Sequence, residues 1–165
     1  MMRQVLILDD EEAVLGALYR ALRRAFGADT VEIERFCDPE AALLRAGEKD
    51  FDVVIADYRM PGLNGADVFS LLKRIQPAAV RILLSASTKH AEIMDAVERG
   101  DVFRYLAKPW DYGELIEVVD AAFDRHRLPE SGLALSRQQL ETLRLEREEP
   151  GITWVNRDEH GNILL

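Results

Sequence analysis

Acidic side chains follow two apolar runs of this sequence, each at the point where the run ends. Asp9 and Asp10 come directly after Gln4–Leu8, and Asp57 comes after the run Phe51–Ala56. Short runs rich in β-branched and apolar residues are typical of buried parallel strands, whose carboxyl ends meet at the ligand-binding edge of an open sheet. Three carboxylates gathered there would repel one another. We therefore expect a divalent cation with oxygen ligands, Mg²⁺, to lie between them.

Two further apolar runs end in groups of other types. Val80–Leu84 is followed by Ser85, and Phe103–Ala107 is followed by Lys108 and Pro109. At the same edge of the sheet, a hydroxyl and an ammonium group would face the three carboxylates. The charge of Mg²⁺ together with that of Lys108 would balance the three negative charges.

These groups, in this order along the chain, resemble the receiver domain of bacterial two-component response regulators. The resemblance runs from about Arg3 to about Arg125 and includes the stretches DYRMPG and FRYLAKPW. Receivers with these stretches are often joined to cyclic-di-GMP phosphodiesterase or other regulatory outputs. Residues 127–165 are too few to encode such an enzyme, so we do not expect them to form one. The resemblance implies a signalling phosphoacceptor that catalyses only its own phosphorylation and dephosphorylation.

The resemblance also implies a role for each residue that would handle the phosphoryl group. Asp57 would accept it from a phosphohistidine on a sensor histidine kinase or phosphotransfer protein. Lys108 and Ser85 would bind phosphoryl oxygens, and a cis peptide before Pro109 would orient the lysine. Ser85 and Tyr105 would then act as a switch pair that changes the face made by the fourth helix, the fifth strand and the fifth helix. That face would control an unidentified downstream protein or self-association.

A metal-binding set follows from the same resemblance. Asp10 would be a direct Mg²⁺ ligand and Asp9 would act through a water molecule. Asp57 would supply one oxygen, and Arg59 would supply its backbone carbonyl. The Arg59 side chain is not constrained by that role and could lie over the phosphoryl group.

The fold predicted from the alternating patterns is α/β. Five strands alternate with five helices, which with right-handed crossovers gives a doubly wound parallel sheet. The resemblance implies a flavodoxin-like strand order of 2-1-3-4-5. Helices are expected over Glu12–Phe26, from Asp38-Pro39 to Gly47, from Asn64-Gly65 to Pro77, over His90–Arg99 with an end at Gly100, and over Asp111–Arg125.

Three segments make up the predicted domain organisation: a receiver over residues 1–126, a linker over 127–135 and an extension over 136–165. The extension is expected to form a helix and then a β-hairpin around a polar turn. An isolated hairpin is marginal in water, so it needs a surface to lie on. We expect a docking or dimerisation element, with docking onto its own receiver as the alternative.

Composition narrows the possible partners. A net charge of −9 in 165 residues disfavours a nucleic-acid surface, which needs clustered Lys and Arg. No apolar run is long enough to cross a membrane, and the single cysteine, Cys37, forms no intrachain disulfide, so we expect a cytoplasmic protein.

Other interpretations of the same residues remain open. A magnesium-dependent phosphatase with an aspartyl nucleophile usually has a second acid two residues after that nucleophile, where this chain has Arg59. A degenerate receiver that only binds partners would not need Asp57, Ser85 and Lys108 together. In the plainest alternatives the acidic pair would only cap a helix, and Tyr105 would be an ordinary packing aromatic.

Overall fold

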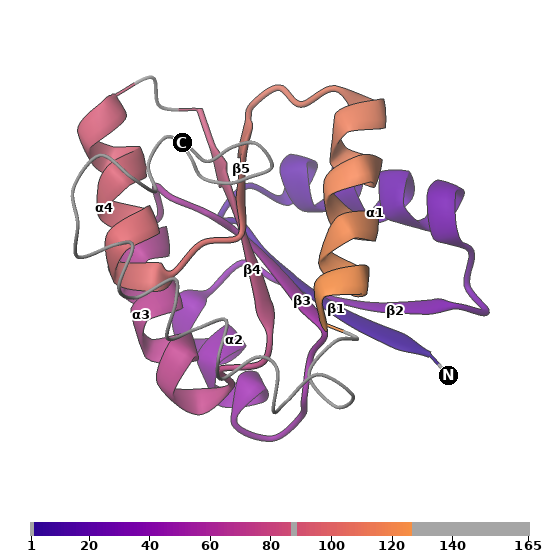
Figure 1. The fold of residues 1–165 in the computed structure, drawn as a ribbon, viewed down its shortest axis with the longest axis horizontal. Coiled ribbons are helices and arrows are strands. Elements are labelled where there is room, and N and C mark those ends of the chain that lie inside the picture. The colour runs from indigo at the N-terminus through magenta and orange to yellow at the C-terminus, as the bar shows by residue number, and fades with distance from the viewer. Residues whose placement is uncertain (1, 87–88, 127–165) are drawn as a thin grey trace, which may run out of the picture. The chain divides into compact units, whose positions relative to one another are not determined.

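The computed structural model describes residues 2–86 and 89–126. They form a five-stranded parallel sheet in the order β2-β1-β3-β4-β5, which confirms the predicted α/β fold (Figure 1). The strands are β1 (Arg3–Leu8), β2 (Val31–Phe36), β3 (Val53–Asp57), β4 (Val80–Ser85) and β5 (Arg104–Ala107). The helices are α1 (Glu12–Phe26), α2 (Pro39–Ala46), α3 (Gly65–Ile75), α4 (His90–Gly100) and a last helix over residues 112–126. The linker predicted over 127–135 and the extension predicted over 136–165 lie outside the described residues.

Helices cover both faces of the sheet, and each face has its own hydrophobic core (Figure 1). The first core joins the sheet to α1 and to helix 112–126, drawn in orange, and the second joins it to α2, α3 and α4. Every residue of β3 and β4 is buried, as expected of central parallel strands. In the edge strand β2, by contrast, Val31 and Ile33 are buried and Glu32 is exposed.

Side chains predicted to start helices do so. The Asp38 carboxylate accepts a hydrogen bond from the backbone N–H of Ala41, with Pro39 at the first position of α2. Asn64 and Asp67 form a reciprocal capping box at the start of α3. These caps satisfy backbone donors that the helix itself leaves unpaired.

The end of α4 differs from its prediction by one residue. Gly100 belongs to the helix, and the left-handed residue that ends it is Asp101, with a φ of 54°. Gly100 is needed for a different reason, because a Cβ there would lie 2.5 Å from the Cβ of Phe69 on α3. The glycine therefore allows α3 and α4 to approach closely.

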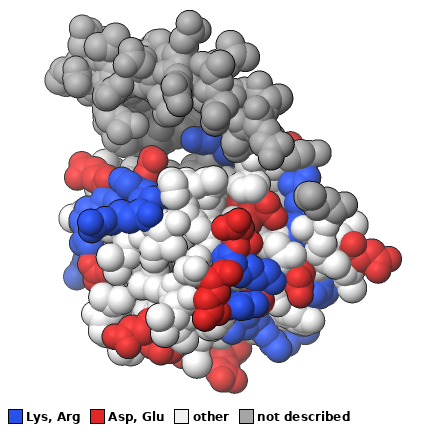
Figure 2. All heavy atoms as spheres, turned by 90° about the horizontal axis from the view of Figure 1, so that it is seen from below, with Lys and Arg blue, Asp and Glu red and all other residues white. Residues whose placement is uncertain are grey.

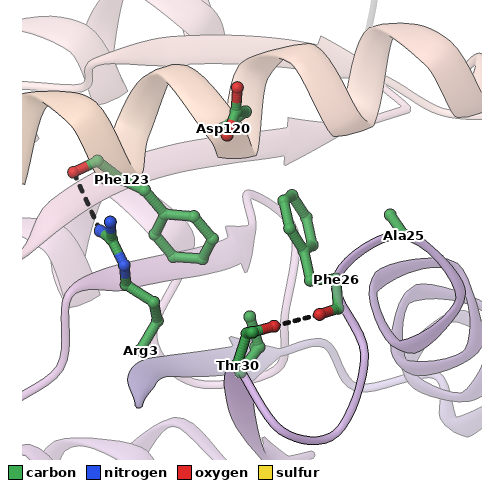
Figure 3. A pocket seen from close by; sticks show the side chains of 7 residues that line it. Arg3, Ala25, Phe26, Thr30, Asp120 and Phe123 are labelled. Atoms are coloured by element: carbon green, nitrogen blue, oxygen red, sulfur yellow. Dashed lines mark hydrogen bonds between the residues drawn. The ribbon is translucent and has the colours of Figure 1, made fainter. Parts of the chain in front are cut away.

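Helix 112–126 is fixed to the amino end of the sheet by aromatic and cationic contacts. The rings of Phe26 and Phe123 meet edge to face, with centroids 5.3 Å apart. The Arg3 guanidinium lies 4.9 Å from the centre of the Phe123 ring and donates a 3.2 Å hydrogen bond to the Phe123 carbonyl. These residues, with Thr30 and Asp120, line a shallow pocket between α1 and helix 112–126 (Figure 3). Asp57 and Lys108 lie at the other end of the strands, their carboxyl ends.

Charged side chains of both signs lie next to one another on the face shown in Figure 2. One ion-pair network joins β2 to α2 and the turn after it. Glu34 lies 2.9 Å from Arg45 Nε and 2.8 Å from Lys49 Nζ. The hydrogen bond from Arg45, followed by that from Lys49, lowers the pKa of Glu34 to about 2.

Among residues 2–86 and 89–126, no helix has the length and apolar character needed to cross a membrane.

We predict that Glu34→Gln lowers the free energy of unfolding by about 1–2 kcal/mol at pH 7, less than its pKa shift alone would give, because the group is partly exposed. The pKa of Glu34 is depressed in the folded state, so its contribution is complete above its unfolded value and is lost as the pH falls from about 4.5 toward about 2. Urea denaturation at pH 7 and pH 3 measures both effects, because more than half of the contribution is lost by pH 3. An equal deficit at the two pH values would contradict this account, and Glu117→Gln, at an exposed position within helix 112–126, is the control.

Candidate functional site

Three carboxylates converge at the carboxyl ends of β1 and β3. Asp57 is the last residue of β3 and is 5% exposed, while Asp9 directly follows β1 and is fully buried. Asp10 is exposed. One carboxylate oxygen from each of the three residues can be chosen so that all lie within 4.8 Å of one another. The predicted acidic cluster is therefore present in the fold.

Lys108 brings a positive charge to this cluster. Its Nζ lies 2.9 Å from Asp9 Oδ2 and 3.3 Å from Asp57 Oδ1, and 3.9 Å from Glu11 Oε1. The backbone N–H of Lys108 donates a hydrogen bond to the Ser85 carbonyl, and the peptide bond to Pro109 is cis, as the resemblance to receivers implied. Lys108, which follows β5, thus contacts residues at the carboxyl ends of β1, β3 and β4.

Burial dominates the electrostatics of the carboxylates. It raises the pKa of Asp57 to about 6, and the charge of Asp9 adds to this effect. Burial also raises the pKa of Asp9, although the hydrogen bond from Lys108 opposes it. For Lys108, burial disfavours the ammonium, but the hydrogen bond to Asp9 and the charge of Asp57 together outweigh it, so its pKa is raised. The Lys108 ammonium alone therefore does not offset the free energy needed to keep two buried carboxylates ionised.

The donor set fits Mg²⁺. Asp9, Asp10 and Asp57 offer only carboxylate oxygens, which are hard ligands, and the exposed Asp10 leaves a side open to water. A divalent cation would also supply the positive charge that the raised pKa values of Asp9 and Asp57 show to be lacking. The residues of the acidic cluster can therefore hold a Mg²⁺ ion.

Ser85 and Tyr105 lie on neighbouring strands beside this cluster. Ser85 is the last residue of β4 and is buried, with Ala107 of β5 as its partner in the register. Tyr105 is partly buried on β5 and packs against the core that lies under α3 and α4. The fold thus places Ser85 at the end of the strand next to β3 and Tyr105 on the strand that leads to Lys108, and their switching roles remain predictions.

The Arg59 side chain, from the loop after β3, contacts helix α4. Its guanidinium forms two hydrogen bonds with the carboxylate of Glu92, and the neighbouring Tyr58 hydroxyl donates one to Asp95. No sequence pattern pointed to Glu92 or Asp95. They lie within an ordinary amphipathic helix and become partners of Tyr58 and Arg59 only when α4 packs beside the loop.

Gly65 shapes the loop after Asp57. A Cβ at this position would lie 2.7 Å from the Asp57 carbonyl oxygen and 2.9 Å from Tyr58 Cα. The Gly65 N–H also donates a 2.7 Å hydrogen bond to the Tyr58 carbonyl. The start of α3 is therefore held against the backbone of the phosphoacceptor candidate, which only a residue without a side chain permits.

Comparison with known proteins agrees with this geometry. The response regulator receiver domain family model matches residues 5–120. The hydrogenase transcriptional regulatory protein HoxA of Cupriavidus necator is 34% identical over 131 residues, covering 75% of this chain and 26% of HoxA. The transcriptional regulatory protein CutR of Streptomyces coelicolor is 31% identical over 126 residues, covering 76% of this chain and 56% of CutR. The chain thus spans less than two thirds of these relatives.

A solved structure gives the same result. The signal receiver domain of an HD domain-containing protein from Pseudomonas fluorescens Pf-5 superposes with a TM-score of 0.72 at 25% identity, over 77% of this chain and 98% of that one. The fold and the acidic cluster define a receiver domain. The chain belongs to the response regulator receiver domain family of two-component systems.

Because the ionised Asp57 is disfavoured in the fold, we predict that Asp57→Asn stabilises the protein by about 1–3 kcal/mol at pH 8 with a chelator present. The pKa of Asp57 is raised, so stability from this carboxyl is complete below 3.8 and is lost as the pH rises through about 6. The gain should shrink toward pH 4. Chemical denaturation across this range checks it, and a destabilised variant at pH 8 would refute the electrostatic account.

Proposed function

We propose that Asp57 accepts a phosphoryl group from a phosphohistidine on a sensor histidine kinase or phosphotransfer protein. The observation that carries this proposal is the position of Lys108 Nζ, which contacts the buried carboxylates of both Asp9 and Asp57. An ammonium group held beside the attacking oxygen can bind a phosphoryl oxygen without rearrangement. Membership of the receiver family supports the same reaction.

The proposed step is a displacement at phosphorus. An Asp57 carboxylate oxygen forms the new P–O bond as the P–N bond to the histidine breaks, and the imidazole leaves with that electron pair. Such transfers depend on in-line positioning and on neutralising the phosphoryl oxygens. Lys108 would bind one oxygen and the Ser85 hydroxyl another. Asp57 is only 5% exposed, so few water molecules would have to leave its carboxylate before the attack.

Mg²⁺ is the proposed cofactor, and when bound it would neutralise phosphoryl and carboxylate charge. Asp10 and Asp57 would hold it directly, with Asp9 acting through water and Arg59 through its backbone carbonyl. The chain's own contribution is to fix these oxygens: Asp9 Oδ1 accepts a hydrogen bond from the Glu11 N–H, which orients the carboxylate.

The proposed output is a change on the face formed by α4, β5 and helix 112–126. Ser85 would move toward the new phosphoryl group, and Tyr105 would rotate into the space that this vacates. That face would control a downstream protein or self-association. The relatives HoxA and CutR are transcriptional regulators, and the chain covers only part of each, so the downstream partner remains a proposal. We place the protein in the cytoplasm, where its phosphoryl donor would act.

Removing the acceptor tests the reaction itself. Asp57→Asn should abolish the acid-stable, base-labile label that acetyl phosphate leaves on the wild type, because the amide oxygen is a poor nucleophile. Radiolabelling with intact-mass analysis measures this, and Asp29→Asn, an exposed aspartate on the loop before β2, is the matched control. Equal labelling of wild type and Asp57→Asn would refute the proposal. Catalytic turnover instead of a stable label would favour a phosphatase.

The ligand roles predict an order of affinities. Asp9→Ala should weaken Mg²⁺ binding by about 10–100-fold, the range for a group that acts through another ligand. Asp10→Ala should weaken it more, because a direct ligand is lost. Calorimetric titration of the unphosphorylated protein gives both constants. The reverse order would show that the two aspartates exchange roles.

A further inference from the structure

The two residues after Asp57 both contact the first half of α4. Arg59 Nη2 lies 2.8 Å from Glu92 Oε2 and Arg59 Nε lies 3.3 Å from Glu92 Oε1, a two-point contact between guanidinium and carboxylate. The Tyr58 hydroxyl donates a 3.1 Å hydrogen bond to Asp95 Oδ2. Residues three apart lie on one face of a helix, so Glu92 and Asp95 present a single acidic edge to this loop.

The carboxyl end of α4 is held separately. Arg81 of β4 is buried, and its Nε donates a 2.7 Å hydrogen bond to the Gly100 carbonyl. Gly100 packs directly on Phe69 of α3. The Arg99 guanidinium also pairs with Asp67 near the start of α3. The Arg81 and Gly100 contacts run to β4 and to the body of α3, away from the loop after Asp57, whereas Arg99 also lies 3.5 Å from Asp95 Oδ2, the oxygen that Tyr58 contacts.

Charge decides how Arg59 responds to a phosphorylated Asp57. Its side chain is 59% exposed, so the guanidinium can change partners without disturbing a core. With Mg²⁺ and Lys108 bound there, phosphorylation of Asp57 still adds up to about one unit of negative charge to the site, and it adds three acceptor oxygens. An arginine two residues from the acceptor can therefore exchange its contact with Glu92 for a contact with these oxygens.

We propose that Arg59 is shared between Glu92 and the anion on Asp57, and that this exchange releases the first half of α4. In the unmodified protein Arg59 is a positioning residue that holds α4 against the phosphoacceptor loop. After phosphorylation it contacts the phosphoryl oxygens, and the first turns of α4 loosen about the end fixed by Arg81. This inference rests on the proposed function of Asp57.

Two variants distinguish an Arg59 that is shared between Glu92 and the anion on Asp57 from an Arg59 that only holds α4 in place. Glu92→Gln and Arg59→Gln should each speed amide hydrogen exchange in the first half of α4 in the unmodified protein. Their affinities for beryllofluoride with Mg²⁺ should change in opposite directions. Glu92→Gln removes the competing anion and should tighten binding about two- to fivefold, whereas Arg59→Gln should weaken it by at least as much; these are the ratios that an exposed ion pair of ~0.4–1 kcal/mol gives.

Glu98→Gln is the matched control, because it removes the same charge from an exposed position on the same helix. It should leave both the exchange rates and the affinity at their wild-type values. If the wild type binds beryllofluoride but both variants shift its affinity in the same direction, or neither speeds exchange in α4, the inference is wrong and the proposed function stands. If the wild type neither binds beryllofluoride nor takes the label, the proposed function fails and this inference fails with it.

Discussion

The burial of Asp9 and Asp57 beside a single ammonium group is the constraint on which the rest of this structure depends. Two buried carboxylates cost more free energy than Lys108 returns, as the raised pKa values of both aspartates show. The fold keeps them together because β1 and β3 are neighbouring central strands with apolar residues on both faces. The hydrophobic core thus supplies the energy that holds an electrostatically unfavourable site in place.

An unfavourable cluster of this kind is suited to binding and transfer. It favours any ligand that brings positive charge, which explains why an oxygen-liganded cation fits here. It also keeps the proposed acceptor carboxylate desolvated, so that little solvent must be removed when a phosphoryl donor approaches. Lys108, fixed through its backbone to Ser85, can serve the resting carboxylates and the proposed phosphoryl group from one position.

The surroundings of the site differ in how tightly they are held. Gly65 ties the start of α3 to the Asp57 backbone, and buried Arg81 ties the end of α4 to β4. The first half of α4, in contrast, meets the site through polar contacts from Tyr58 and the exposed Arg59. Exposed ion pairs are weak and respond to nearby charge, whereas packed contacts do not. A change of charge at Asp57 is therefore expected to affect this part of α4 first.

The sequence by itself determined the order of the strands' functional groups and the residues at which α2 and α3 begin, and the resemblance to receivers implied the strand order. The first two depend on local patterns: apolar runs end at Asp9, Asp57, Ser85 and Lys108, and Asp38 and Asn64 directly precede the helices that they cap. Only the tertiary structure decided that Arg59 pairs with Glu92 and Tyr58 with Asp95, across 33 and 37 residues. It also showed that Gly100 serves the contact between α3 and α4 and does not itself end the helix. The physical reason is that these contacts depend on how whole elements pack, which no local spacing records.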